Sequence, residues 1–129
     1  MTKQGDVITQ EDRYKGALPS TFQYGCASAS YQIEGGFDED GKGPNVWDVA
    51  MKDMAENGNR ACDSYHLWKD DIELLKKYGC NTYRFSISWA RVKPLGGKGD
   101  PVNEAGIKYY SDLVCRSLLL HLSRNPGSR

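Results

Sequence analysis

The sequence predicts an α/β fold with a parallel sheet, and three observations lead to this prediction. Two short stretches alternate apolar and polar residues with the period of a β-strand. A strongly amphipathic helical stretch lies between them, and a second helical stretch follows the second strand. Because the order is strand, helix, strand, helix, we expect parallel strands joined by right-handed crossovers.

The first predicted strand lies in residues 22–27, where apolar side chains alternate with polar or small ones. The alternating side chains are Phe22, Tyr24 and Cys26. A turn is expected over residues 28–36. Residues 37–62 are rich in Gly, Asp and Asn, and only residues 44–51 look helical, with a proline near the first helical position. Such a long surface segment is usually functional or disordered.

The clearest predicted helix covers residues 63–78, with Asp63 as its N-cap and Gly79 as its stop. Four apolar residues recur on one helical face: Tyr65, Trp68, Ile72 and Leu75. The second predicted strand covers residues 82–88. Its side chains alternate, with Tyr83, Phe85 and Ile87 on one face and Arg84, Ser86 and Ser88 on the other.

A loose turn of glycines is expected at residues 96–99, before a final helix. Asn103 is the expected N-cap of this helix. Its apolar positions are predicted to be Ile107, Tyr110 and Val114.

The composition excludes several classes of function. The 129 residues suit one domain, and 17 Lys and Arg balance 17 Asp and Glu, so no basic face is offered to nucleic acid. No apolar run approaches the ~20 residues of a membrane span, so we expect no membrane partner. Residues 1–17 are polar and lack the apolar stretch of a signal peptide. We therefore expect a flexible polar leader and a cytoplasmic protein.

The four cysteines are Cys26, Cys62, Cys80 and Cys115. No pair has the C-x-x-C spacing of a zinc or redox site, so no metal site is expected. A reducing compartment would keep all four as thiols. We interpret them as small buried apolar side chains.

Both predicted strands end in polar residues, and ligands bind at the carboxyl ends of strands in parallel α/β folds. Residues 30–36 follow the first strand and include Gln32, whose amide donates and accepts hydrogen bonds. Adjacent sugar hydroxyls have the same double capacity, so Gln32 is a candidate sugar-binding residue. The alternative is that Gln32 satisfies backbone groups within a tight turn.

Arg84 is the second candidate, because it stands inside a strand with aromatic neighbours. Burying an arginine there is costly unless it meets a carboxylate, so a partner acid is expected nearby. The alternative is that the arginine reaches solvent from an edge strand.

Other polar residues are weaker candidates. His66 is expected to be a packed or capping side chain rather than a base, and His121, near the end of the chain, receives little weight. The carboxylates of residues 38–40 and 70–71 are expected to be solvated. The paired and clustered glycines lack the spacings of phosphate-binding loops.

These residues together resemble the amino-terminal part of glycoside hydrolase family 1, the β-glucosidase family. Five segments match that family in order and at family-like spacing, over about residues 18–114. They are residues 22–36 (FQYGCASASYQIEGG), 40–48 (DGKGPNVWD), 61–66 (ACDSYH), 83–91 (YRFSISWAR) and 102–107 (VNEAGI).

The resemblance implies a TIM (β/α)8 barrel, of which about the first two β/α units are present. By this similarity, Gln32 would hydrogen-bond hydroxyls of the sugar before the scissile bond, and Arg84 would lie beside the catalytic nucleophile and hold it ionised. The family is retaining, with a glutamate acid and a glutamate nucleophile ~5–5.5 Å apart. It implies a β-glucoside or related oligosaccharide as substrate, and neither a metal nor an organic cofactor.

The motifs of the two catalytic glutamates are absent from these 129 residues. The family places its acid in Asn-Glu-Pro and its nucleophile in a Thr-Glu-Asn-Gly type motif, and neither occurs here. Glu104 follows an asparagine but belongs to a helix start, and the family's aromatic-His-Trp-Asp motif is also missing, so His121 has no counterpart in it. We therefore expect the chain alone to be inactive. The alternative function is a non-catalytic truncated product or a weak sugar-binding remnant.

Residues 115–129 depart from the family pattern and contain no Asp or Glu. We expect this divergent tail to come from out-of-frame or retained-intron translation. A piece with two strands of an eight-stranded barrel also has an unpaired strand edge and uncovered apolar faces. We expect such a piece to aggregate or to stay partly unfolded.

Overall fold

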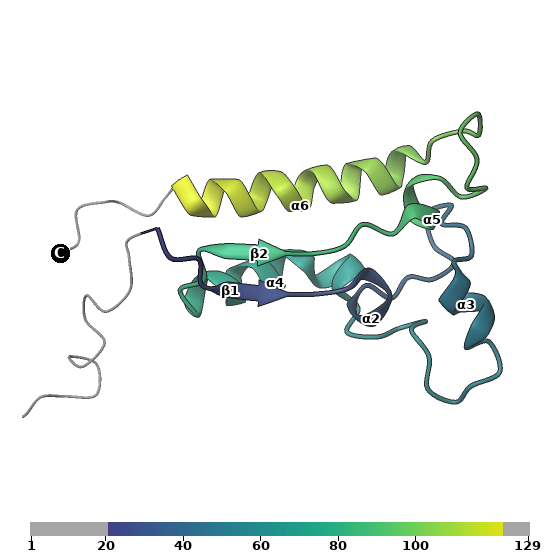
Figure 1. Cartoon of the computed structure of the whole chain (residues 1–129), viewed down its shortest axis with the longest axis horizontal. Helices are drawn as coiled ribbons and strands as arrows, with labels where there is room; N and C mark the ends of the chain where they lie inside the picture. Colours follow the sequence, from purple (N-terminus) through teal and green to yellow (C-terminus); the bar gives the residue numbers. More distant parts are fainter. Residues whose placement is uncertain (1–20, 123–129) are drawn as a thin grey trace, which may run out of the picture.

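A two-stranded parallel sheet organises the computed structural model, which describes residues 21–122, with side chains through residue 119 (Figure 1). The strands are β1 (Gly25–Ala27) and β2 (Thr82–Arg84). Their register pairs Gly25 with Thr82, Cys26 with Tyr83 and Ala27 with Arg84. The predicted leader, residues 1–17, and the last seven residues of the predicted tail lie outside the described range.

Both strands are shorter than predicted, because side chains replace the strand hydrogen bonds at either end. Before β1, the Asn81 side chain accepts from the backbone N–H of Tyr24 at 2.7 Å and donates to the carbonyl of Phe22 at 2.8 Å. Beyond β2, the hydroxyl of Ser86 accepts from the backbone N–H of Ser30 at 2.8 Å. The prediction of parallel strands in this order is confirmed.

The helix α4 (Ser64–Lys77) confirms the helix predicted at residues 63–78. Its stop is also confirmed, because Gly79 has a φ of 74°, which favours glycine. The predicted N-cap position of Asp63 is confirmed, but its side chain does not cap the helix. This residue lies at the N-cap position with a φ of 57°, makes no side-chain cap hydrogen bond, and instead bonds His66 Nδ1 at 2.6 Å.

The helix α6 (Glu104–Leu122) follows the predicted N-cap, and the side-chain oxygen of Asn103 accepts from the backbone N–H of Ala105 at 3.2 Å. Its predicted apolar face is partly wrong. Ile107 and Val114 are 39% and 40% exposed, whereas the buried face includes Tyr109, Tyr110 and Leu113. The rings of the two adjacent tyrosines, Tyr109 and Tyr110, both pack in the core. The helix continues past position 114 without a break.

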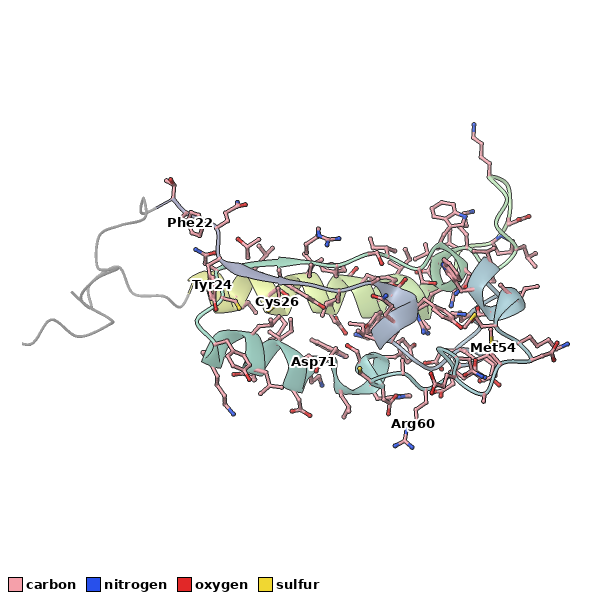
Figure 2. The ribbon with its side chains drawn as sticks, turned by 60° about the horizontal axis from the view of Figure 1, so that its bottom comes forward. Phe22, Tyr24, Cys26, Met54, Arg60 and Asp71 are labelled. Carbon is pink, nitrogen blue, oxygen red and sulfur yellow. The ribbon has the colours of Figure 1, made fainter. Side chains whose placement is uncertain are left out.

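The core lies between the sheet and the two long helices, which both cover the same side of the sheet in Figures 1 and 2. Ile72 of α4 packs against Tyr109, Tyr110 and Leu113 of α6. Partly buried side chains complete the cluster: Tyr65, Trp68, Leu75, Tyr83, Phe85 and Val92. The apolar face predicted for α4 is therefore confirmed.

Three short helices lie at the end of the molecule toward which both strands point (Figure 1). They are α2 (Ser30–Ile33), α3 (Val46–Ala50) and α5 (Trp89–Val92). The second of these is shorter than predicted, because Asn45 forms its N-cap and accepts from the backbone N–H groups of Trp47 and Asp48. Among the described helices, none is long and apolar enough to cross a membrane.

The interpretation of the cysteines as small buried side chains is wrong. Cys26, Cys62 and Cys115 are exposed, and Cys80 is half-buried. Cys62 lies in the turns before α4, and Cys115 follows the outward-facing Val114 on α6. Neither position is covered by another described element.

Candidate functional site

The segments that follow the two strands are held together at the carboxyl end of the sheet. The backbone N–H of Ser28 donates to the carbonyl of Arg84 at 2.9 Å, which continues the ladder one residue past β1. The hydroxyl of Ser28 also bonds the hydroxyl of Tyr83 at 2.7 Å. The helix α2 follows directly, so its residues lie above the strand ends (Figure 1).

Gln32 lies on α2 and is exposed. Its backbone N–H donates to the carbonyl of Ala29 at 3.0 Å. Within the described residues its side-chain amide makes no hydrogen bond, so the alternative that it satisfies backbone groups in the turn receives no support. The amide is available to donate to and accept from a ligand.

Arg84 is the last residue of β2 and is also exposed. It lies on the face of the sheet opposite Tyr83, whose ring packs against the core. No carboxylate in the described part of the chain forms an ion pair with it. The register places Arg84 opposite Ala27, five residues before Gln32. The structure thus brings both predicted site residues to the carboxyl ends of neighbouring strands.

A buried ion pair supports the turn that follows Gln32, and the sequence reasoning did not find it. Arg91 on α5 is fully buried, and its Nε donates to Glu34 Oε2 at 3.1 Å. Its Nη2 donates to the carbonyls of Gly35 and Gly36 at 2.9 and 3.3 Å. One guanidinium therefore holds three consecutive residues.

Two aromatic side chains complete the surroundings of this ion pair. The hydroxyl of Tyr110 donates to Glu34 Oε1 at 2.6 Å and accepts from the backbone N–H of Ser88 at 2.7 Å. Burial raises the pKa of Tyr110, and the neighbouring Glu34 carboxylate raises it further, so the phenol keeps its proton. The Arg91 guanidinium lies over the ring of Tyr65, with 3.9 Å between its carbon Cζ and the centre of the ring.

Gly35 cannot be replaced in this turn without moving the backbone. Its φ is 67°, and a Cβ atom there would lie 2.2 Å from the carbonyl oxygen of Arg60. The carbonyl of the preceding Glu34 accepts from the backbone N–H of Tyr65 at 2.9 Å, at the start of α4. The turn is therefore fixed to α4 as well as to α5, and Gln32 projects from a rigid base.

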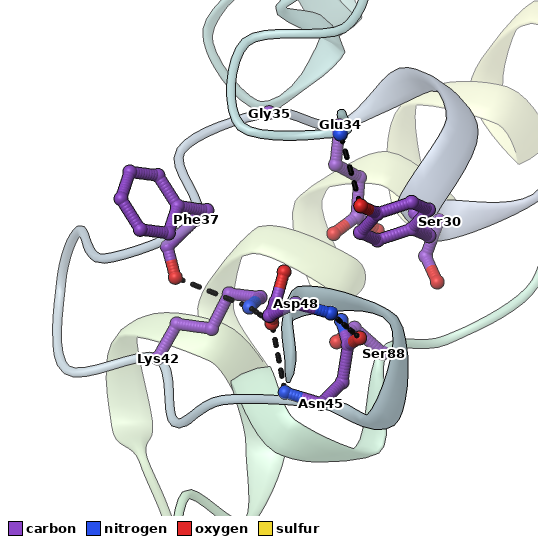
Figure 3. A pocket seen from close by; sticks show the side chains of 10 residues that line it. Ser30, Glu34, Gly35, Phe37, Lys42, Asn45, Asp48 and Ser88 are labelled. Carbon is purple, nitrogen blue, oxygen red and sulfur yellow. Dashed lines mark hydrogen bonds and ion pairs between the residues drawn. The ribbon is translucent and has the colours of Figure 1, made fainter. Parts of the chain in front are cut away.

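A second buried ion pair lies in a polar pocket beside the same turn (Figure 3). Lys42 Nζ donates to Asp48 Oδ2 at 2.7 Å, and both side chains are less than a tenth exposed. The ammonium also donates to the carbonyls of Phe37 and Gly43 at 3.1 Å. Because the two charges neutralise each other, we interpret this pocket as structural support for residues 37–48.

His66 is exposed and lies between two carboxylates. Its Nδ1 bonds Asp63 at 2.6 Å, and its Nε2 bonds Glu39 at 2.9 Å. The hydrogen bond to Asp63 is the largest cause that raises the pKa of His66 above 6.5. The side chain of the other predicted weak candidate, His121, lies outside the described range.

Residues 38–40 and Asp70 are exposed, as expected of solvated carboxylates, while Asp40 and Asp71 also accept hydrogen bonds. Asp40 accepts from the Tyr65 hydroxyl at 2.7 Å, and burial together with this bond raises the pKa of Tyr65 to about 12. Asp71 accepts from the Ser64 hydroxyl at 2.6 Å. Across residues 21–119, no cluster of three or more His, Cys, Asp or Glu side chains could hold a metal ion.

Comparisons with known proteins identify the family to which this chain is similar. A family profile described as "Glycosyl hydrolase family 1" matches residues 14–123. Beta-glucosidase 1B of Phanerodontia chrysosporium is 54% identical over 102 residues, which are 75% of this chain and 19% of that protein. The chain thus spans about a fifth of the length of the curated relatives that it matches.

Two solved structures are similar to this chain over most of its length. The crystal structure of the beta-glucosidase from Trichoderma harzianum superposes with a TM-score of 0.78 at 47% identity, over 81% of this chain and 23% of that one. A beta-glucosidase from the fungus Humicola insolens, solved in complex with glucose, gives a TM-score of 0.77 at 47% identity. It covers 81% of this chain and 23% of that one.

Proposed function

Because the chain belongs to glycosyl hydrolase family 1, we propose that it contributes the first two β/α units to a retaining β-glucosidase with a (β/α)8 barrel. The proposed substrate is a β-glucoside or a related oligosaccharide. The observation that supports this most is the placement of Gln32 and Arg84. Both are exposed at the carboxyl ends of adjacent parallel strands, where barrel enzymes build their sites.

Gln32 is proposed to bind and orient the sugar. Its amide oxygen accepts from one hydroxyl while its amide nitrogen donates to the next one, which fits two adjacent hydroxyls. The buried Glu34–Arg91 pair fixes the turn directly after Gln32, so the amide position is set before the sugar arrives. A hydrogen bond that strengthens as the ring distorts would lower the barrier rather than only increase affinity.

Arg84 is proposed to act on the nucleophile through charge. A guanidinium close to a carboxylate lowers the pKa of that carboxylate and keeps it ionised, which is the state needed for attack on the anomeric carbon. The nucleophile itself is not among these 129 residues. The exposed position of Arg84, without an ion pair in the described residues, fits a side chain whose partner comes from another part of a barrel.

The 129 residues alone are proposed to lack activity. A retaining mechanism needs one glutamic acid to protonate the leaving oxygen and one glutamate to attack, and neither family motif occurs here. As an isolated piece, the chain is proposed to be at most a weak sugar binder.

A chimera tests the proposal. Residues 18–114 would replace the matching segment of Beta-glucosidase 1B, whose remaining four-fifths lies outside the matched region. We expect the folded chimera to hydrolyse an aryl β-glucoside, and the purified 129-residue chain to show no turnover with the same substrate. The control variant is Lys108→Gln, since this side chain on α6 is exposed and pairs only with Asp112 among the described residues.

Two results would overturn the proposal. A chimera that folds, as judged by circular dichroism and gel filtration, but does not cleave the substrate would exclude a role for this segment in the enzyme. Turnover by the purified 129-residue chain that disappears in Gln32→Ala would instead show that the chain is catalytic without the glutamates.

A further inference from the structure

Two cysteine thiols lie next to each other on the side of the sheet that faces the helices. The sulfur atoms of Cys26 and Cys80 are 3.9 Å apart. Cys26 is the middle residue of β1 and pairs with Tyr83, whose ring packs on the core, so its side chain is on the same face of the sheet. Cys80 lies between α4 and β2.

The backbone around both thiols is fixed by hydrogen bonds. Asn81, directly after Cys80, donates from its backbone N–H to the carbonyl of Tyr24 at 2.8 Å, and its side chain bonds the backbone of Tyr24 and Phe22. The backbone N–H of Cys80 donates to the carbonyl of Leu75 at 3.1 Å, at the end of α4. The backbone segments that carry the two sulfurs are therefore held next to each other by hydrogen bonds.

We propose that Cys26 and Cys80 form a redox-sensitive dithiol pair, which a small-molecule disulfide such as oxidised glutathione converts into an intramolecular disulfide. A disulfide bond has an S–S length of roughly 2.05 Å, so the two sulfurs must approach by about 2 Å from their present distance. Rotation about the two side chains shares this movement. The proposal is independent of the glycosidase function.

The oxidation runs in two exchange steps. The thiolate of Cys26, which is the more exposed of the two, attacks one sulfur of oxidised glutathione; this forms a mixed disulfide and releases one glutathione thiolate. The thiolate of Cys80 then attacks the Cys26 sulfur and displaces the second glutathione thiolate. The protein loses two electrons and two thiol protons, and one oxidised glutathione is reduced to two thiols.

The product would link β1 to the segment that enters β2. The link encloses α2, α3 and α4 in one covalent loop, which restricts the unfolded chain. Cys80 precedes β2, whereas Arg84 ends it, and the side chains of Cys26 and Arg84 lie on opposite faces of the sheet. Oxidation is therefore expected to raise thermal stability and to leave the sugar site unchanged.

The four cysteines give an internal test of this pairing. In an unfolded chain, loop-closure entropy favours the pair that is closest in sequence. That pair is Cys62 and Cys80, 80 − 62 = 18 positions apart, against 54 for Cys26 and Cys80. The (3/2)RT ln n rule makes the short loop roughly fivefold more frequent. The folded chain should reverse this preference, because its geometry and not its loop length sets the pairing.

The experiment oxidises the 129-residue chain in a glutathione buffer, once in native buffer and once in urea, and maps the disulfides by trypsin digestion and mass spectrometry after the remaining thiols are blocked. In native buffer we expect the Cys26–Cys80 product, in which peptide 16–42 is joined to peptide 78–84. The ratio of this product to the Cys62–Cys80 product should be at least tenfold higher in native buffer than in urea. The variants Cys62→Ser and Cys115→Ser should keep the product, whereas Cys80→Ser should lose it. Equal ratios in the two buffers, or no intramolecular disulfide in native buffer, would overturn the proposal.

Discussion

The Glu34 carboxylate accepts a hydrogen bond from Arg91 Nε at 3.1 Å, although the two residues are 57 positions apart and both side chains are almost fully buried. The pair joins the turn after β1 to the helix after β2. Because the same guanidinium binds the carbonyls of Gly35 and Gly36, this contact fixes the backbone that follows Gln32. Two side chains in the interior thus set the position of one at the surface.

Loss of the Arg91 side chain should destabilise the fold strongly. Arg91→Ala leaves the Glu34 carboxylate buried without its cation, and breaking a buried pair in this way costs about 3–5 kcal/mol. Urea unfolding of the chain at low protein concentration, followed by tryptophan fluorescence, measures the change. The matched control is Arg116→Ala, which removes the exposed pair with Glu73 and should cost no more than about 1 kcal/mol. Equal losses in the two variants would contradict the assigned role.

Removal of the Tyr110 hydroxyl should also be costly, although the ring stays. Tyr110→Phe deprives Glu34 Oε1 of a donor and the backbone N–H of Ser88 of an acceptor, both in the interior. Each unsatisfied buried group costs about 1–3 kcal/mol. The same urea titration compares it with Tyr24→Phe, an exposed tyrosine whose change should stay within about 0.5 kcal/mol. A loss for Tyr110→Phe no larger than that of the control would show that the hydroxyl is not needed.

His66 should titrate above its ordinary pKa of 6.5, with Asp63 as the main cause and Glu39 as a further one. Because the folded-state pKa is raised, the stabilisation is fully present below pH 6.5 and is lost as the pH rises through the folded pKa. NMR titration of the imidazole signals measures this pKa, and Asp63→Asn should lower it more than Glu39→Gln does. A His66 pKa at or below 6.5 in the folded chain would refute the arrangement.

The 129-residue chain should self-associate. Large apolar side chains that follow or precede the strands are exposed, among them Tyr24 at 59%, Ile87 at 56% and Trp89 at 60%. In the described residues β2 pairs only with β1, which leaves its other edge open. Analytical ultracentrifugation over a range of concentrations should show growing oligomers, with increased fluorescence of an apolar dye. A chain that stays monomeric at every concentration and does not bind the dye would contradict this expectation.

The sequence predicts a helix or strand well where one of its faces is apolar. It predicts the bounds of an element less well where contacts with residues distant in the sequence set those bounds. The spacing of Tyr65, Trp68, Ile72 and Leu75 predicted α4 almost to its ends, because helical periodicity is a local property. The strand lengths were wrong, since the side chains of Asn81, before β1, and Ser86, after β2, take backbone bonds that longer strands would use.

The candidate site shows the same division. Gln32 and Arg84 could be proposed as site residues because their residue types and their places after or within predicted strands were visible in the sequence. The Glu34–Arg91 pair could not be, because the partners belong to different units and nothing in a local pattern connects them. The one signal for this pair in the sequence was an arginine in the otherwise uncharged helix Trp89–Val92. Like Arg84, this arginine would need a carboxylate partner if it were buried.

Substitutions of Gln32 and Arg84 should change the kinetics of the chimera with Beta-glucosidase 1B in different ways. Gln32→Ala removes hydrogen bonds to sugar hydroxyls, so KM should rise and kcat should fall. Together these changes should lower kcat/KM by about 10- to 100-fold, while the pH profile stays unchanged. Arg84→Ala removes the charge that holds the nucleophile ionised, so the pKa of the acidic limb of kcat/KM should rise by about 1 unit or more. Arg84→Lys should restore part of that shift, because the positive charge returns without the forked geometry. If Arg84→Ala lowers the rate but leaves the acidic limb in place, the arginine acts on position or folding and not on the ionisation of the nucleophile.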